Sequence, residues 1–191
     1  MPGVDIPVEE SWPRITTWLT RHAPVTAAAI RPSAGVAEVP GVGSLPADLL
    51  GWWGLMDGIA DADYRAGSPI PPCYLPLPVA DVRDRLAGLA RFADEDCCGA
   101  GGAHATAAGE TSFGYCTATV PIRWSLGGDV LVVDLRDGPR HGCVLEWTAE
   151  EGYADMAWAG TAAMLADVAN QLDDPKRTEI VDGGVLQWTS H

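Results

Sequence analysis

Cysteine and histidine are the residues of this chain whose chemistry could support nucleophilic catalysis or metal binding. The four histidines are His22, His104, His141 and His191. The five cysteines are Cys73, Cys97, Cys98, Cys116 and Cys143. No serine stands in the Gly-x-Ser-x-Gly turn of a hydrolase, and Cys143 is a neighbour of His141 only along the chain. A nucleophile and its base are defined by their geometry in space, so a distant Cys–His pair is an alternative that no local pattern supports.

Metal-binding residue types come closest together in the Gly- and Ala-rich stretch at residues 94–111, which we interpret as a long loop. Cys97, Cys98 and His104 lack the two-residue spacing that lets a pair of thiolates face one zinc ion. We therefore expect no metal and no cofactor. A metalloprotein or enzyme that uses these three residues and Cys116 is the alternative.

Two further ligand-binding patterns are incomplete. The acidic run at residues 57–63 lacks the ordered loop and terminal glutamate of a calcium site. The glycines at residues 99–102 are not followed by the lysine of a phosphate-binding loop. Neither pattern predicts a site.

The charge balance favours a basic partner. Asp and Glu number 26 against 12 Lys and Arg, which gives a formal charge of -14 and a pI near 4.4. Such a field repels nucleic acid and anionic lipid and attracts basic proteins. We therefore expect a protein partner, and neither nucleic acid nor a membrane. An acidic surface that serves solubility alone is the alternative.

The apolar segments predict a cytoplasmic protein. No apolar run approaches the roughly 20 residues that span a bilayer. The first residues lack the basic start and apolar stretch of a signal peptide. The odd number of cysteines argues against a disulfide framework, so we expect reduced thiols.

Acidic residues in loops are the candidate contacts for a basic partner. Trp53 is a further candidate, because Trp52 and Trp53 would point about 100° apart on a helix and one of them would be partly exposed. The candidate binding residues are Trp53, Asp57, Asp61, Asp63, Asp94, Glu95 and Asp96. A solvated rim without a binding role is the alternative for the acids, and core packing is the alternative for Trp53. We expect five tryptophans in the core: Trp12, Trp18, Trp52, Trp124 and Trp147.

Three segments have the period of an amphipathic helix, namely residues 8–22, 79–93 and 161–172. In the second of them Val82 faces inward, while Asp84 and Arg85 face solvent.

Local signals place the ends of the helices. Ser11 is expected to cap the first helix, and Pro24 to end it. A fourth helix is expected from residue 45, with Ser44 as its cap and Gly58 beyond its end.

The second half of the chain has the pattern of a sheet. Residues 119–124, 129–135 and 142–147 predict an antiparallel meander whose middle strand is central, and residues 153–158 a short edge strand. Residues 173–191 predict a terminal hairpin. The expected fold is therefore α+β, an antiparallel sheet with helices packed on one face. We expect a single domain over residues 1–191, with its core at about 11–172.

The order of these elements resembles the SUKH superfamily, named for a yeast cell-wall-synthesis regulator and its bacterial relatives. The similarity lies in an opening helix, a Leu-Pro-x-Asp-Leu helix followed by Asp-Gly, central strands with Pro-Ile, Gly-Gly and Asp-Leu, and a closing helix. The matching residues are Trp12 to Leu19, Leu45 to Gly58, Val120 to Trp147 and Thr161 to Leu172.

The resemblance implies an α+β fold without catalytic residues. It also implies a protein-binding module, because many bacterial relatives are immunity proteins that neutralise polymorphic toxins, often nucleases or deaminases. A basic toxin that acts on nucleic acid would be attracted to a chain of charge -14. A regulatory scaffold linked to cell-wall or signalling control is the alternative that the yeast relative suggests.

Overall fold

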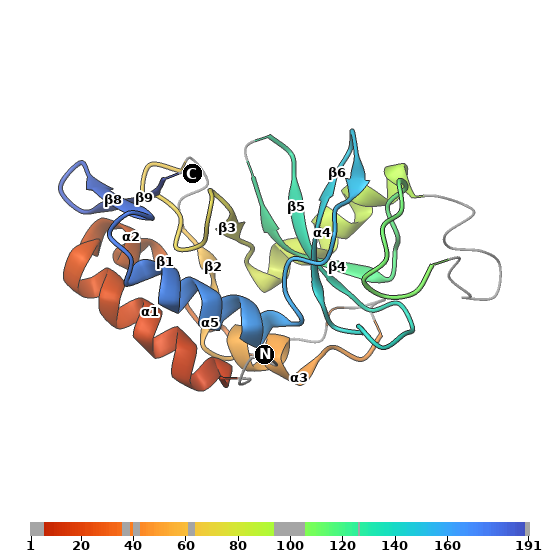
Figure 1. The fold of residues 1–191 in the computed structure, drawn as a ribbon, viewed down its shortest axis with the longest axis horizontal. Helices are drawn as coiled ribbons and strands as arrows, with labels where there is room; N and C mark the ends of the chain where they lie inside the picture. Colours follow the sequence, from red (N-terminus) through yellow and green to blue (C-terminus); the bar gives the residue numbers. More distant parts are fainter. Residues whose placement is uncertain are drawn as a thin grey trace.

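A five-stranded antiparallel sheet forms the centre of the fold in the computed structural model, which describes residues 6–35, 39, 43–60, 64–93, 106–125 and 127–189 (Figure 1). Neighbouring strands follow one another in chain order. The strands are β3 (Leu75–Pro76), β4 (Thr119–Trp124), β5 (Val130–Asp134), β6 (Val144–Thr148) and β7 (Gly152–Tyr153). The predicted α+β fold and its meander are confirmed.

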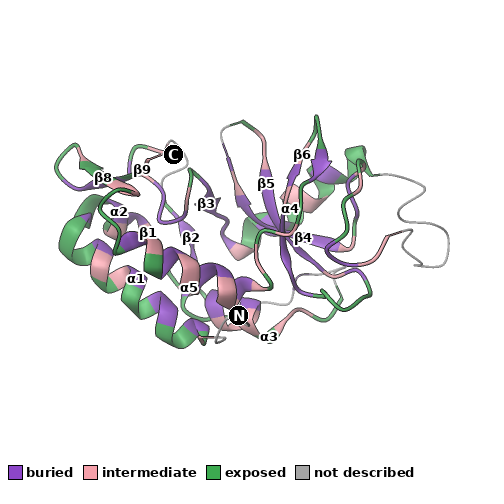
Figure 2. Cartoon of the chain, viewed as in Figure 1, coloured by how far each residue is buried: buried purple, intermediate pink, exposed green. Residues whose placement is uncertain are grey.

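Strand β5 is buried on both faces, which explains its unbroken run of apolar residues. Leu131 and Val133 belong to the cluster that contains the helices. Val130 and Val132 belong to a second cluster on the opposite face. That second face is therefore also covered, by residues 115–118 and the end of α4, and the central strands are buried (Figure 2).

The helices contribute to the cluster on the face of the sheet that carries Leu131 and Val133, and the end of α4 reaches the other face. They are α1 (Val8–His22), α2 (Pro24–Ala29), α3 (Ala47–Trp53), α4 (Val79–Leu89) and α5 (Thr161–Leu172), and a short 3-10 helix, η1 (Ala90–Phe92), extends α4. Helices α1 and α5 run side by side (Figure 1). The three helices predicted from the apolar period are confirmed as α1, as α4 with η1, and as α5.

Helix ends differ from the local predictions. Ser11 lies inside α1 and is buried, while α1 begins after Pro7. Pro24 does not simply end α1, because it occupies the first turn of α2, where a missing N–H costs nothing. Ser44 does not cap α3, which begins after Pro46.

The expected fourth helix is shorter than predicted. It ends at Trp53, and the next residues form β2 (Met56–Ile59), which pairs with β1 (Ile30–Pro32). All four residues of β2 are buried. Pairing with the distant strand β1 therefore determines that residues 56–59 form a strand, and the local Asp-Gly pattern does not determine it.

Asp48 connects two helices. Its carboxylate accepts hydrogen bonds from the backbone N–H of Leu49 at 2.9 Å and of Ala162 at 3.0 Å. Ala162 lies in the first turn of α5, whose N-cap residue Gly160 has no side chain to offer. Asp48 therefore caps α5 from another helix, in addition to lying near the start of its own.

The terminal hairpin is confirmed as β8 (Thr178–Val181) and β9 (Val185–Trp188). It is attached to the rest of the chain, because the Trp188 indole N–H donates to the Ser68 carbonyl at 2.9 Å. The backbone N–H of Leu186 also donates to Thr26 Oγ1 at 2.9 Å.

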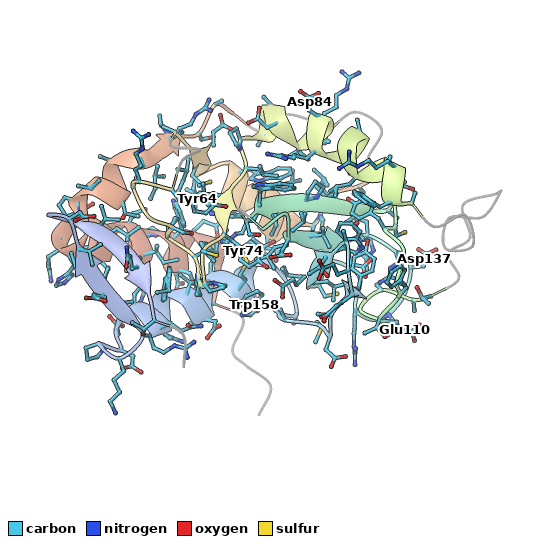
Figure 3. All side chains as sticks on the ribbon, turned by 90° about the horizontal axis from the view of Figure 1, so that it is seen from above. Tyr64, Tyr74, Asp84, Glu110, Asp137 and Trp158 are labelled. Atoms are coloured by element: carbon cyan, nitrogen blue, oxygen red, sulfur yellow. The ribbon has the colours of Figure 1, made fainter. Side chains whose placement is uncertain are left out.

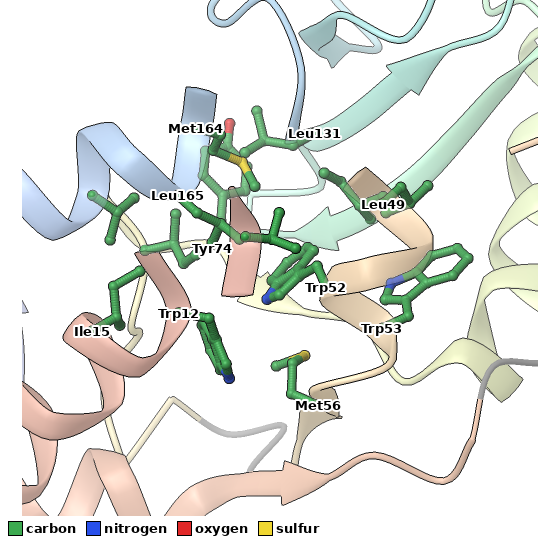
Figure 4. Packing of buried hydrophobic residues seen from close by; sticks show 14 of the residues in the cluster. Trp12, Ile15, Leu49, Trp52, Trp53, Met56, Tyr74, Leu131, Met164 and Leu165 are labelled. Carbon is green, nitrogen blue, oxygen red and sulfur yellow. The ribbon is translucent and has the colours of Figure 1, made fainter. Parts of the chain in front are cut away.

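The main core combines aliphatic side chains with Trp12, Trp52, Trp53 and Tyr74 (Figure 4). Trp12 meets Trp52 edge to face, with ring centroids 6.0 Å apart. Of the five tryptophans expected in the core, Trp12, Trp52 and Trp147 are buried, and Trp18 and Trp124 are partly buried against it.

Candidate functional site

Asp57, one of the predicted contact residues, is a structural residue. Its side chain is buried and forms an ion pair with Arg31, at 3.2 Å between Nη2 and Oδ2. Its Oδ1 accepts the backbone N–H of Val79 at 2.8 Å, at the start of α4. The expected placement of Asp57 in a loop is wrong, because β2 carries Asp57 inward, where the α4 N-terminus stabilises its charge.

Trp53 is buried as well, with 1% of its surface exposed. The expectation that Trp52 or Trp53 would be partly exposed is wrong. Both α1 and α5 contact α3, so this short helix is covered on more than one side. The side chains of Trp52 and Trp53 point about 100° apart on α3, and both directions lie within the core.

Five predicted acidic contacts lie outside the residues that the structure describes, and so do Cys97, Cys98 and His104. The five are Asp61, Asp63, Asp94, Glu95 and Asp96. The zinc alternative and most of the proposed acidic contacts therefore stay predictions.

The thiols that the structure describes differ in exposure. Cys116 and Cys143 are buried, and Cys73 is exposed. Burial, together with the charge of Asp134, raises the pKa of the Cys143 thiol to about 11. His141 Nδ1 lies 3.1 Å from the Arg136 carbonyl oxygen. Within the described ranges, no group of three or more His, Cys, Asp or Glu residues could hold a metal ion.

A cleft of about 590 Å³ lies where three segments meet. One wall is the second half of α4 with η1, the second is the β4–β5 turn, and the third is the β6–β7 turn. Asp84 lies on the outer side of α4 (Figure 3). A cleft of this size can accept several side chains of a partner protein.

The base of the cleft is aromatic. Trp147 lines the cleft and is itself buried, with the Phe92 ring 5.4 Å away between centroids. Trp124 is the last residue of β4 and is covered by the Arg85 guanidinium, 3.9 Å from the ring centroid. Arg91 lies 4.7 Å above the Phe92 ring. The two arginines of the cleft therefore stack on rings.

Four carboxylates line the same cleft, against those two arginines. They are Asp84, Asp129, Glu150 and Glu151. Asp129 accepts a hydrogen bond from Ser125 Oγ at 3.0 Å. The other three are exposed, and none of the four forms an ion pair with another residue that the structure describes. The cleft therefore combines an aromatic base with an acidic rim.

Phe113 extends this surface beyond the cleft. It is 70% exposed, the largest exposure among the big apolar side chains of the described residues. Its segment lies against β7, because the Tyr153 N–H donates to the Ser112 carbonyl at 2.8 Å. Gly152 has a φ of +77°, and an added Cβ there would lie 2.5 Å from Phe113 Cα. Phe113 therefore sits directly beside the turn that carries Glu150 and Glu151.

Sequence reasoning missed this cleft, although part of its signal was present. The helical period placed Asp84 and Arg85 on the outer face of α4, which the structure confirms for Asp84, whereas Arg85 is half-buried on Trp124. The patterns also placed Trp124 and Trp147 in strands. That these three segments meet depends on the packing of α4 against the sheet, which no local pattern contains.

No helix in the described parts of the chain is long and apolar enough to cross a membrane. No family model matches the chain, and a search of curated proteins finds no match. The resemblance to the SUKH superfamily therefore stays an interpretation of the residues alone.

Proposed function

We propose that this chain is a non-enzymatic protein-binding module that neutralises a basic protein by covering it. The observation that carries the proposal is the cleft, which joins an aromatic base to four carboxylates in a chain of net charge -14. Concave aromatic surfaces with a charged rim are typical of protein-binding hot spots.

The SUKH-like order of elements makes a toxin of the nuclease or deaminase type the partner that we propose. Such enzymes bind nucleic acid with basic surfaces, and an acidic inhibitor is attracted to the same surfaces. The long-range field would raise the association rate, and the aromatic contacts would lower the dissociation rate. The proposal places both proteins in the cytoplasm.

Co-expression tests this function directly. The product of the neighbouring gene is expressed in a bacterial host with and without this chain, and growth and co-purification are measured. The proposal predicts toxicity that this chain relieves, together with a stable one-to-one complex. Toxicity without rescue, or rescue without a complex, would contradict neutralisation by direct binding.

A further inference from the structure

We propose that the cleft between α4 and the turns at residues 124–129 and 147–151 binds an arginine side chain of the basic partner. This inference rests on the proposed function and adds to it the location of the site and the chemistry of its occupant.

Charge favours a cation in the cleft. Asp84, Glu150 and Glu151 are exposed on its rim and form no ion pair within the described residues. The cleft's own cations offset only part of this charge, because Arg85 and Arg91 are two positive groups against four carboxylates, and both lie over the rings of Trp124 and Phe92. An incoming cation would therefore find carboxylates in need of a partner.

Shape and chemistry favour arginine over lysine. A planar guanidinium can lie against an aromatic surface while its N–H groups bind a carboxylate in a two-point contact. Two arginines of the chain itself already stack on the aromatic rings of this cleft, at 3.9 and 4.7 Å from the ring centroids. A guanidinium from outside would bind the exposed carboxylates beside these stacked pairs.

Trp147 gives the cleft a ring whose surroundings an occupant would change. Its side chain lines the cleft and is 98% buried, yet its indole N–H finds no acceptor among the described residues. Buried N–H groups are nearly always paired, and an unpaired one costs about 1–3 kcal/mol. Trp52 in the main core has an indole N–H that is unpaired within the described part of the chain as well.

Phe113 gives the partner an apolar contact beside the carboxylates. It is 70% exposed and lies next to the turn that carries Glu150 and Glu151. The aliphatic stem of arginine, or an apolar neighbour of that arginine, can pack against such a ring.

The test uses a peptide probe and the full chain labelled with ¹⁵N. The probe is acetyl-Gly-Arg-Gly-Arg-Gly-amide, and the signals observed are the assigned indole N–H resonances. Binding in the cleft shifts the resonances of Trp124 and Trp147, while those of Trp12 and Trp52 in the main core stay in place. The same peptide with citrulline in place of arginine, neutral but of equal shape, causes no shift.

Two double variants, each of which removes two negative charges, distinguish binding in the cleft from attraction to the net charge of the chain. Glu150→Gln with Glu151→Gln weakens binding of the arginine peptide about tenfold, since two charge-assisted contacts are lost. Glu9→Gln with Glu10→Gln, exposed on α1, weakens it by less than about twofold. Equal losses in the two pairs, or shifts that avoid Trp124 and Trp147, would overturn the inference.

The outcome separates this inference from the proposed function. If the toxin binds the chain and the Glu150→Gln and Glu151→Gln variant binds it equally well, the cleft is not the contact, and the proposed function stands. If no toxin binds but the arginine peptide occupies the cleft as described, the proposed function fails and the site stands.

Discussion

Asp134 and Arg136 lie two residues apart at the end of β5 and form an ion pair with both side chains fully buried. Arg136 Nη2 lies 2.7 Å from Asp134 Oδ2, and Nε lies 3.0 Å from Oδ1. Burial lowers the pKa of Arg136, but the hydrogen bond and charge of Asp134 outweigh that effect and raise it. The guanidinium also donates to Thr106 Oγ1 and to the Glu110 carbonyl, so the pair fixes the segment that leads to residues 115–118 on the second face of the sheet.

Breaking this pair should destabilise the protein strongly. Asp134→Ala leaves a buried guanidinium without its charge partner, and we expect a loss of about 3–5 kcal/mol in the free energy of unfolding. Urea denaturation measures it. The matched control is Asp173→Ala, which removes an exposed ion pair to Arg14 and should cost less than about 1 kcal/mol. Similar losses for the two variants would contradict the structural role given to Asp134.

Arg123 should behave in the opposite way. It is fully buried, its guanidinium nitrogens have no hydrogen-bond partner among the described residues, and its guanidinium carbon lies over the Trp52 ring at 5.3 Å from the centroid. Burial lowers its pKa well below the ordinary value. Arg123→Met keeps the length and removes the unpaired charge, so we expect about 1–4 kcal/mol of added stability. Thermal unfolding checks this, and a lower Tm would show that the guanidinium stabilises the native chain.

Glu146 should make the stability depend on pH. Burial and the charge of Glu151 raise its pKa in the folded chain. Its contribution to stability is therefore fully present below the ordinary glutamate pKa and is lost as the pH rises through the folded value. Glu146→Gln should raise the Tm at pH 7 and change it little at pH 4. A variant that is equally stabilised at both values would contradict this assignment.

Exposure should decide which described thiols react. Iodoacetamide should modify Cys73 in the native chain and spare Cys116 and Cys143, which are buried. Partial desolvation, with the charges of Asp129 and Glu146, raises the pKa of the exposed Cys73 thiol, so its labelling should need a higher pH than that of a free cysteine. Peptide mass spectrometry before and after urea unfolding measures the difference. Native labelling of Cys143 would place it at the surface.

Periodic patterns predicted the helices that bury one face and the central strand that is buried on both faces. The apolar residues of α1 and α5 and the unbroken run in β5 are local signals, and each element lies where expected. The terminal hairpin followed from its turn residues in the same way.

The sites depended on partners that are distant in sequence. Asp57 follows a helix and precedes a glycine, a local pattern that an exposed acid in a turn would share. Its partners, Arg31 and the start of α4, are distant in sequence, and with them Asp57 is buried. Trp53 is buried because two other helices cover α3. The cleft requires α4 to pack against the sheet close to two of its turns, a relationship that no single segment of the sequence records.

The central claim, that the chain binds a basic protein through an acidic surface, is tested most directly by calorimetric titration with the purified neighbouring gene product. We predict a one-to-one complex whose affinity falls as sodium chloride rises, because salt screens the attraction between the two surfaces. The absence of binding at low salt, or an affinity that salt does not change, would contradict the claim.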